Sequence, residues 1–187
     1  MGPRQQAGGA GRPFAVVDID GVVADVRHRL PHLARRPKDW AGFFAGIPLD
    51  PVLDVGREAC LTLAEGCELV WLTGRPETFR RPTLDWLARH DLPEGRLLMR
   101  RALDRRPARA VKVEALRALA RERPVAVHVD DDPAVVRAVR AAGFQALHAD
   151  WMPVEEHVEE QGAEHSLVHR RPRQGDLFEA QEREGRT

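Results

Sequence analysis

Cysteine, tyrosine and long apolar runs are scarce or absent in this chain of 187 residues. It contains two cysteines, no tyrosine, and no apolar run near the roughly 18 residues that a membrane-spanning helix needs. Cys60 and Cys67 have no cysteine or histidine partners at metal-binding spacing, which excludes a disulfide framework and a structural zinc site. The polar stretch 1–12 lacks the apolar core of a signal peptide. We therefore expect a cytoplasmic protein with no membrane partner.

Lysine is also nearly missing from the chain. Lys38 and Lys112 are the lysines among its 29 basic residues, and the others are arginines. The 29 acidic residues balance this charge, so the net charge does not indicate a nucleic-acid-binding protein. Codon bias is a sufficient explanation for the arginine excess, but a lysine at a chemically special position stands out against it.

Apolar runs of strand length alternate with helical patterns along the middle of the chain. The pairs Asp50-Pro51 and Asp132-Pro133 are typical of helices that have an aspartate cap and a proline in the first turn. Five strands alternating with helices predict an α/β fold with a doubly wound parallel sheet. The expected strands are 14–18, 68–73, 96–99, 125–130 and 144–148, and the expected helices are 51–64, 78–90, 109–121 and 133–142.

The pattern divides the chain into one domain and two tails. Residues 13–152 have the length of an ordinary single domain. Within it, residues 21–50 follow the first strand and would form a flap or small cap. Residues 1–12 and 153–187 are polar, and we expect them to be disordered. A flap this small leaves an open site, which favours the end of a macromolecule as substrate over an enclosed metabolite.

Polar residues that could carry chemistry follow the first two expected strands. Asp18 and Asp20 lie two positions apart, directly before Gly21, whose conformational freedom permits a bend. The first carboxylate could act as a nucleophile and the second as an acid and base. Residues 73–75 (Thr-Gly-Arg) provide a hydroxyl, backbone amides and a guanidinium, which suit phosphoryl oxygens.

The fourth strand ends in the aspartate run 130–132. Clustered carboxylates without histidine or cysteine suit a hard cation with oxygen ligands, above all Mg²⁺. Lys112, in the preceding helix, would place a positive charge near a transferred phosphate. Because ligands of such sheets lie beyond the carboxyl ends of the strands, these residues are expected to meet at one site.

In this order, the motifs resemble the haloacid dehalogenase superfamily of aspartate-nucleophile phosphatases. The resemblance covers roughly residues 13–152 and implies a strand order of 3-2-1-4-5. It implies that Asp18 forms an aspartyl-phosphate and that Asp20 protonates the leaving group and then activates water. Thr73 would hold the phosphoryl group and Lys112 would neutralise charge. The implied Mg²⁺ ligands are Asp18, the Asp20 backbone carbonyl and Asp130, with Asp131 either as a further ligand or as a residue that supports the ligands.

At a finer level the chain resembles the 3′-phosphatase half of phage-type polynucleotide kinase and its stand-alone bacterial relatives. Two positions depart from that pattern: Ala108 stands where an acid is usual, and Asp132 where a basic residue is usual. No GxxxxGK[ST] motif occurs, so we expect no kinase activity. The implied substrate-binding residues are Arg29, Gly74 and Arg75. The segments that carry the resemblance are 18–29, 38–44, 69–75, 83–87, 96–100, 111–116 and 129–143.

The favoured interpretation is a Mg²⁺-dependent phosphatase for 3′-phosphates at nucleic-acid ends. A phosphatase for free nucleotides or other small phosphomonoesters is one alternative. A non-catalytic adaptor recruited through its tail is an alternative of another class. The arginine-rich segment 96–109 could follow a nucleic-acid backbone or could be an ordinary solvated surface.

Several aromatic residues and one histidine flank these motifs. Trp40, Phe43 and Phe44 could stack on a base, although their helical spacing favours packing in the core of the flap. Trp71 and Trp86 are assigned to the core of the domain, and His128 is expected to be a buried strand residue.

A short motif stands out in the C-terminal tail. Gln174, Asp176, Leu177 and Phe178 resemble the peptide by which bacterial replication and repair proteins bind the sliding clamp. Leu177 and Phe178 are an apolar pair in a charged segment, which suits insertion into a preformed pocket. Chance occurrence in a tail of biased composition is the alternative explanation.

Overall fold

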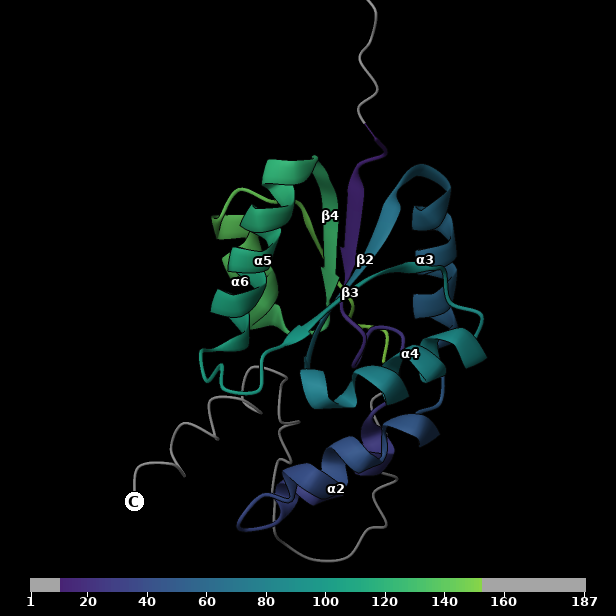
Figure 1. The fold of residues 1–187 in the computed structure, drawn as a ribbon, viewed down its shortest axis with the longest axis vertical. Helices are drawn as coiled ribbons and strands as arrows, with labels where there is room; N and C mark the ends of the chain where they lie inside the picture. Colours follow the sequence, from purple (N-terminus) through teal and green to yellow (C-terminus); the bar gives the residue numbers. More distant parts are fainter. Residues whose placement is uncertain (1–10, 153–187) are drawn as a thin grey trace, which may run out of the picture.

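The computed structural model describes residues 11–152 (Figure 1). Residues 1–10 and 153–187, with the peptide 174–178, lie outside the described residues. Five parallel strands form one sheet in the order β3-β2-β1-β4-β5, which confirms the predicted α/β fold and strand order. The strands are β1 (Phe14–Val17), β2 (Glu68–Pro76), β3 (Gly95–Arg100), β4 (Val125–Asp130) and β5 (Ala146–His148).

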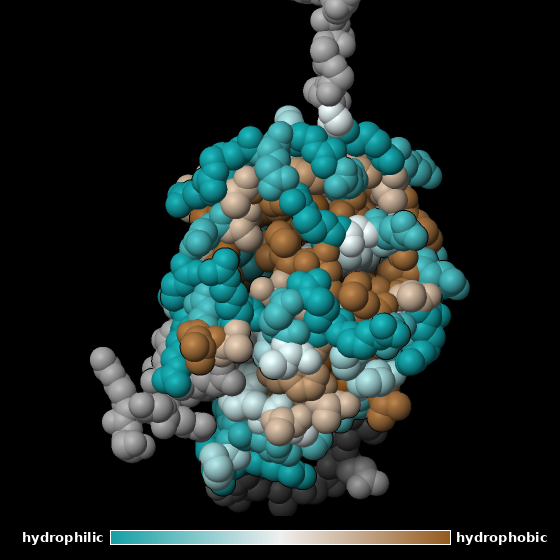
Figure 2. Space-filling model, in the orientation of Figure 1, coloured by the Kyte–Doolittle hydropathy of each residue, from teal (hydrophilic) through white to brown (hydrophobic). Residues whose placement is uncertain are grey.

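Helices cover both faces of the sheet. Helices α5 (Ala108–Glu122) and α6 (Pro133–Ala141) lie on one side, and α3 (Asp54–Gly66) and α4 (Arg80–Arg89) lie on the other (Figure 1). Because side chains alternate along a strand, Phe14 and Val16 pack with the α5 and α6 side of the core, whereas Ala15 and Val17 pack with the other side. Figure 2 shows apolar side chains between the helix layers, framed by hydrophilic ones.

The flap after β1 consists of short helices: η1 (Arg27–Arg29), α1 (Pro31–Ala34), α2 (Trp40–Ala45) and η2 (Ile47–Leu49). Phe43 and Phe44 are buried in its core, and the ring of the half-buried Trp40 stacks on Phe44 with 6.0 Å between centroids. These rings therefore pack the flap, as their helical spacing predicted, together with the buried side chains of Leu33 and Ile47.

The two predicted aspartate-capped helix starts have different outcomes. Asp132 caps α6, since its side chain accepts from the Ala134 amide at 2.7 Å, and Pro133 lies in the first turn. The predicted helix start at Pro51 is wrong, because α3 begins at Asp54. Residues 51–53 remain extended because they bond back to the segment after β1: the Leu53 amide donates to the Val23 carbonyl at 2.8 Å.

Other predictions for the core are confirmed. Trp71, Trp86 and His128 are buried, as is the Cys60 thiol, whose pKa burial raises to about 12. Cys67 is half-buried, and both cysteines are free. Between residues 11 and 152, no helix is long and apolar enough to cross a membrane.

Candidate active site at the carboxyl ends of the strands

Asp18 directly follows β1 and is completely buried. Its amide donates to the Val129 carbonyl at 2.9 Å, which holds it beside β4. Lys112, in the second turn of α5, donates from Nζ to Asp18 Oδ2 and to Asp130 Oδ2, both at 2.6 Å. One buried lysine thus bridges two carboxylates at the carboxyl ends of neighbouring strands, one just after β1 and the other at the last residue of β4. This is the juxtaposition that parallel strand ends predict.

A third carboxylate completes this group. Asp18, Asp130 and Asp131 each offer an oxygen, and these oxygens all lie within 4.8 Å of one another. Asp131 Oδ1 is buried and has no hydrogen-bond partner among residues 11–152. Convergent carboxylate oxygens, one of them unsatisfied, fit a hard divalent cation such as Mg²⁺. These three aspartates would hold it.

Gly21 lets the loop after β1 approach these carboxylates. Its φ of +76° belongs to the left-handed region that favours glycine. A Cβ at this position would lie 2.2 Å from Asp131 Oδ2. The bend predicted from the Asp-x-Asp-Gly pattern is therefore present, and a larger residue would displace a candidate metal ligand.

Burial and mutual repulsion oppose ionisation of the Asp18 and Asp131 carboxylates. Burial raises the pKa of Asp18 to about 7, and Asp130 and Asp20 act in the same direction against Lys112. Burial also raises the pKa of Asp131 well above its usual range. Burial works to raise the pKa of Asp130 too, but Lys112 and His128 outweigh it and lower this pKa to about 2.

We expect Mg²⁺ to raise the melting temperature more at about pH 8 than at about pH 6. The folded-state pKa of Asp18, about 7, lies above its ordinary value of 3.8. The stability that comes with neutral Asp18 is therefore present at low pH and is lost as the pH rises through about 7. A divalent cation offsets the charge that appears over this range. Thermal unfolding with Mg²⁺ and with EDTA measures the effect, and equal shifts at both pH values would contradict it.

His128 supports Asp130 from inside the sheet. Its Nε2 lies 2.9 Å from Asp130 Oδ2, and its Nδ1 lies 3.1 Å from the Val16 carbonyl oxygen. Sequence reasoning identified the burial of His128 but missed this contact. Its place two residues before Asp130 was the available signal, because strand residues two apart point to the same face. A hydrogen bond of this kind, made to a candidate metal ligand from behind, fixes the orientation of its carboxylate.

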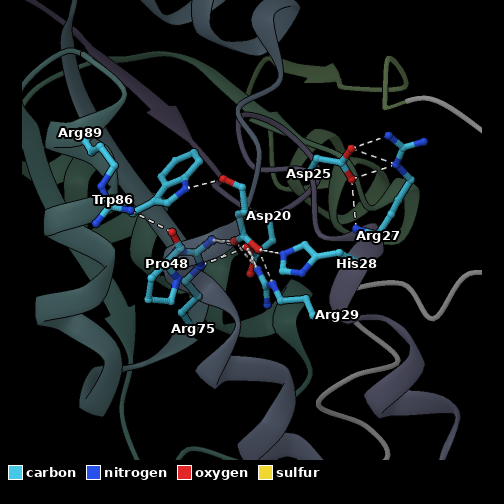
Figure 3. A network of polar contacts seen from close by, with 10 residues as sticks. Asp20, Asp25, Arg27, His28, Arg29, Pro48, Arg75, Trp86 and Arg89 are labelled. Carbon is cyan, nitrogen blue, oxygen red and sulfur yellow. Dashed lines mark hydrogen bonds and ion pairs between the residues drawn. The ribbon is translucent and has the colours of Figure 1, made fainter.

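Asp20 lies in a different environment, among buried arginines (Figure 3). Arg29 Nη2 donates to Asp20 Oδ1 at 2.5 Å, and Arg75 donates to the same oxygen from Nε at 3.0 Å and from Nη2 at 2.6 Å. Burial alone would raise the pKa of Asp20, but the two guanidinium groups outweigh it and lower the pKa to about 2. The hydrogen bonds to Asp20 found within the described chain all fall on Oδ1, which leaves Oδ2 for another partner.

The strand β2 extends past its predicted end at Thr73 and so brings Arg75 to the site. Thr73 and Arg75 are buried, and the Thr73 hydroxyl accepts from the Arg75 amide at 3.2 Å. Gly74 lies between them in the strand and is buried as well. The sequence predicted these three residues as part of the site, and the structure places the Arg75 guanidinium beside Asp20.

Asp50 is a member of this cluster that sequence reasoning missed. Its carboxylate is fully buried and accepts from Arg29 and Arg75. The pattern Asp-Pro suggested a helix cap and so hid this role. No local signal could have revealed it, because the partners lie 21 and 25 residues away in the chain.

The arginine-rich segment 96–109 combines two kinds of residue. Arg100 is buried and donates from Nη1 to the carbonyls of Asp104 and Arg106, at 2.6 and 2.8 Å, so it shapes the loop after β3. Arg101 and Arg105 are exposed on that loop, which follows β3 at the end of the sheet where the flap also lies (Figure 1).

A parallel sheet in the order 3-2-1-4-5, with Asp18, Lys112 and the aspartate pair 130–131 gathered at its carboxyl edge, defines the haloacid dehalogenase class of phosphatases. The family model of the polynucleotide kinase PNKP phosphatase domain matches residues 13–151. The chain belongs to this family of phosphatase domains. The two departures from the family pattern have structural places: Ala108 is buried at the start of α5, and Asp132 caps α6.

Solved structures show the same fold. A Pnkp1/Rnl/Hen1 RNA repair complex contains a chain that is 23% identical, with 74% of this chain and 45% of that chain covered and a TM-score of 0.62. Another structure of this complex gives 21% identity, coverages of 73% and 42%, and a TM-score of 0.62. This chain therefore spans less than half the length of those proteins.

A class C acid phosphatase from Bacillus anthracis with tungstate bound is 15% identical, with 78% of this chain and 70% of that chain covered and a TM-score of 0.54. No curated protein matches the sequence.

Proposed function

We propose that the protein is a Mg²⁺-dependent phosphatase that removes 3′-phosphates from nucleic-acid ends. The observation that carries the proposal is the contact of Lys112 with both Asp18 and Asp130 in a buried group of three carboxylates. This arrangement places a potential nucleophile beside a fixed positive charge and a fitting metal site. Bound Mg²⁺ would neutralise the phosphoryl oxygens and fix them against Asp18.

In the first step an Asp18 oxygen attacks phosphorus, the bond to the 3′ oxygen breaks, and Asp20 gives that oxygen a proton. In the second step water attacks the aspartyl-phosphate while Asp20 takes up a proton, so phosphate leaves and Asp18 is restored. The Oδ2 of Asp20 is the atom suited to this exchange, since the arginines hold Oδ1.

Arg29 and Arg75 are the proposed ligands of the substrate phosphate. Arg29 Nη1 is buried and has no hydrogen-bond partner within the described residues, so it is a donor in need of an acceptor. A phosphate dianion satisfies it and draws both guanidinium groups from Asp20. The weakened arginine contacts then favour protonation of Asp20, which the leaving group requires.

Three observations support a nucleic-acid end as the substrate. The matching family model is that of the polynucleotide kinase PNKP phosphatase domain. Structures with the same fold come from an RNA repair complex. Exposed Arg101 and Arg105 lie on the loop after β3. The test compares a 3′-phosphorylated oligonucleotide with its 5′-phosphorylated isomer, a mononucleotide and p-nitrophenyl phosphate, each with Mg²⁺ and with EDTA. Higher kcat/KM on the mononucleotide than on the 3′-phosphorylated oligonucleotide would favour the small-substrate alternative.

The same assay tests the loop after β3. We expect Arg101→Glu with Arg105→Glu to raise KM for the oligonucleotide and to flatten its salt dependence by about one unit of slope per lost phosphate contact. A small phosphomonoester does not reach the loop, so its KM stays unchanged. Arg117→Glu with Arg121→Glu, which makes the same charge change on exposed positions of α5, is the control. Equal effects on both substrates would show that the loop does not bind the strand.

Binding of a sliding clamp through Gln174, Asp176, Leu177 and Phe178 remains a prediction from the sequence, as does a cytoplasmic location. The clamp peptide lies outside the described residues, and the phosphatase proposal does not rest on it.

A further inference from the structure

Asp50 joins separate parts of the fold through one buried carboxylate. It follows η2 at the end of the flap, whereas its partners lie in η1 and β2. Oδ1 accepts from Arg29 Nε at 2.8 Å, and Oδ2 accepts from Arg29 Nη2 and Arg75 Nη2, both at 2.9 Å. The contact with Arg29 is therefore bidentate, which is the strongest and most directional form of this pairing.

The two arginines are shared between two aspartates. The Nη2 atoms of Arg29 and Arg75 each donate to Asp20 Oδ1 and to Asp50 Oδ2. An Nη atom carries two hydrogens, so each can serve both carboxylates at once. The four groups alternate in charge around a closed ring, with Asp20 on one side of the arginine pair and Asp50 on the other.

The position of Asp50 is itself fixed by α4. The Asp50 carbonyl accepts from Trp86 Nε1 at 2.8 Å. The nearby Pro48 carbonyl accepts from Arg89 Nη1 at 2.9 Å (Figure 3). His28 Nε2 also lies 2.8 Å from Asp50 Oδ1. A carboxylate held from several directions can in turn hold its partners within a narrow range of positions.

Asp50 also supplies charge that the arginines need before substrate arrives. The Arg29 and Arg75 side chains are 1% and 0% exposed, so water does not screen their repulsion. Asp20 alone would leave one of these two buried positive charges uncompensated. Asp20 must also release these arginines when it exchanges a proton with the substrate, whereas Asp50 takes no part in proton transfer.

We propose that Asp50 is a positioning residue that holds Arg29 and Arg75 as a preformed receptor for the substrate phosphate. Its contacts with both arginines persist when the phosphate replaces Asp20 as their partner. This inference rests on the proposed function, which assigns the phosphate to these arginines. The lone pairs of Asp50 face the arginines and His28, so it does not touch the reacting atoms.

The test is Asp50→Asn, which keeps the shape but removes the charge and turns an NH₂ donor toward a guanidinium. With the 3′-phosphorylated oligonucleotide we expect KM and the inhibition constant of inorganic phosphate to rise about tenfold or more. The Mg²⁺ concentration for half-maximal activity should stay unchanged, because the three metal-site carboxylates do not contact Asp50. Asp50→Glu, which restores the charge, should recover part of the phosphate affinity.

Asp25→Asn is the matched control, because it makes the same change on a buried carboxylate that pairs with Arg27 and contacts neither Arg29 nor Arg75. It should leave phosphate inhibition as in the wild type. The inhibition constant reports on active molecules, so partial unfolding of a variant does not distort it. A wild-type inhibition constant in Asp50→Asn, or an equal rise in Asp25→Asn, would overturn the inference. If instead the wild type hydrolyses no phosphomonoester, the proposed function itself fails.

Discussion

Asp18→Asn is expected to lower kcat by about four orders of magnitude while the protein stays folded. A covalent route has no substitute for its attacking oxygen, and the asparagine amide is a poor nucleophile. Folding should survive because asparagine keeps the shape of the side chain. The variant also removes a buried ionisation that is unfavourable, as the pKa of about 7 indicates. Turnover of the 3′-phosphorylated oligonucleotide and thermal unfolding measure the two effects.

Asp25→Asn is the control for this result. Asp25 is also buried, but its carboxylate pairs with Arg27 away from the arginine cluster (Figure 3). The chemical change is identical, but Asp25 belongs neither to the three carboxylates nor to the arginine cluster. The kcat of this variant should therefore remain close to that of the wild type. Substantial Mg²⁺-dependent turnover in Asp18→Asn would exclude the aspartyl-phosphate mechanism.

Lys112→Met is expected to lower both activity and stability. Without the ammonium group, Asp18, Asp130 and Asp131 face one another with no buried counter-charge from α5. Loss of one partner of a buried ion pair costs about 3–5 kcal/mol, so we expect a loss of about that size in the metal-free protein. The developing phosphoryl charge also loses a fixed donor, which lowers kcat by about two to three orders of magnitude.

Chemical denaturation with EDTA and with Mg²⁺ measures the stability effect. Mg²⁺ should recover part of the loss, because it supplies positive charge to the same carboxylates. Arg117→Met is the control, since it removes a cation from an exposed position on the same helix. A metal-free Lys112→Met protein as stable as the wild type would contradict the bridging role of Lys112.

The sequence alone was sufficient to predict the layered fold and the meeting of Asp18, Lys112 and Asp130 at one site. Strand and helix periodicities are local, and alternation of the two constrains the sheet to be parallel with covered faces. Parallel strands then place their carboxyl ends at one edge. Asp18 and Asp130 lie at the carboxyl ends of adjacent strands, so their proximity follows from topology together with the order of the motifs.

The contact of Arg29 and Arg75 with Asp50 could not be derived in this way. Asp50 satisfied a local rule for helix caps, and Arg100 belonged to a run that resembled a charged surface. Both are buried in the folded protein. Asp50 bonds to arginines 21 and 25 residues away, whereas Arg100 bonds to carbonyls of the loop that follows it.

The difference has a physical cause. An apolar pattern specifies which face of an element is buried, and that information lies within a few residues. The partner of a buried charge depends instead on which distant segments fold beside it. Here the flap returns to the sheet and anchors on α4 through Trp86. Only this tertiary arrangement brings Asp50 between Arg29 and Arg75, where burial without such partners would be too costly.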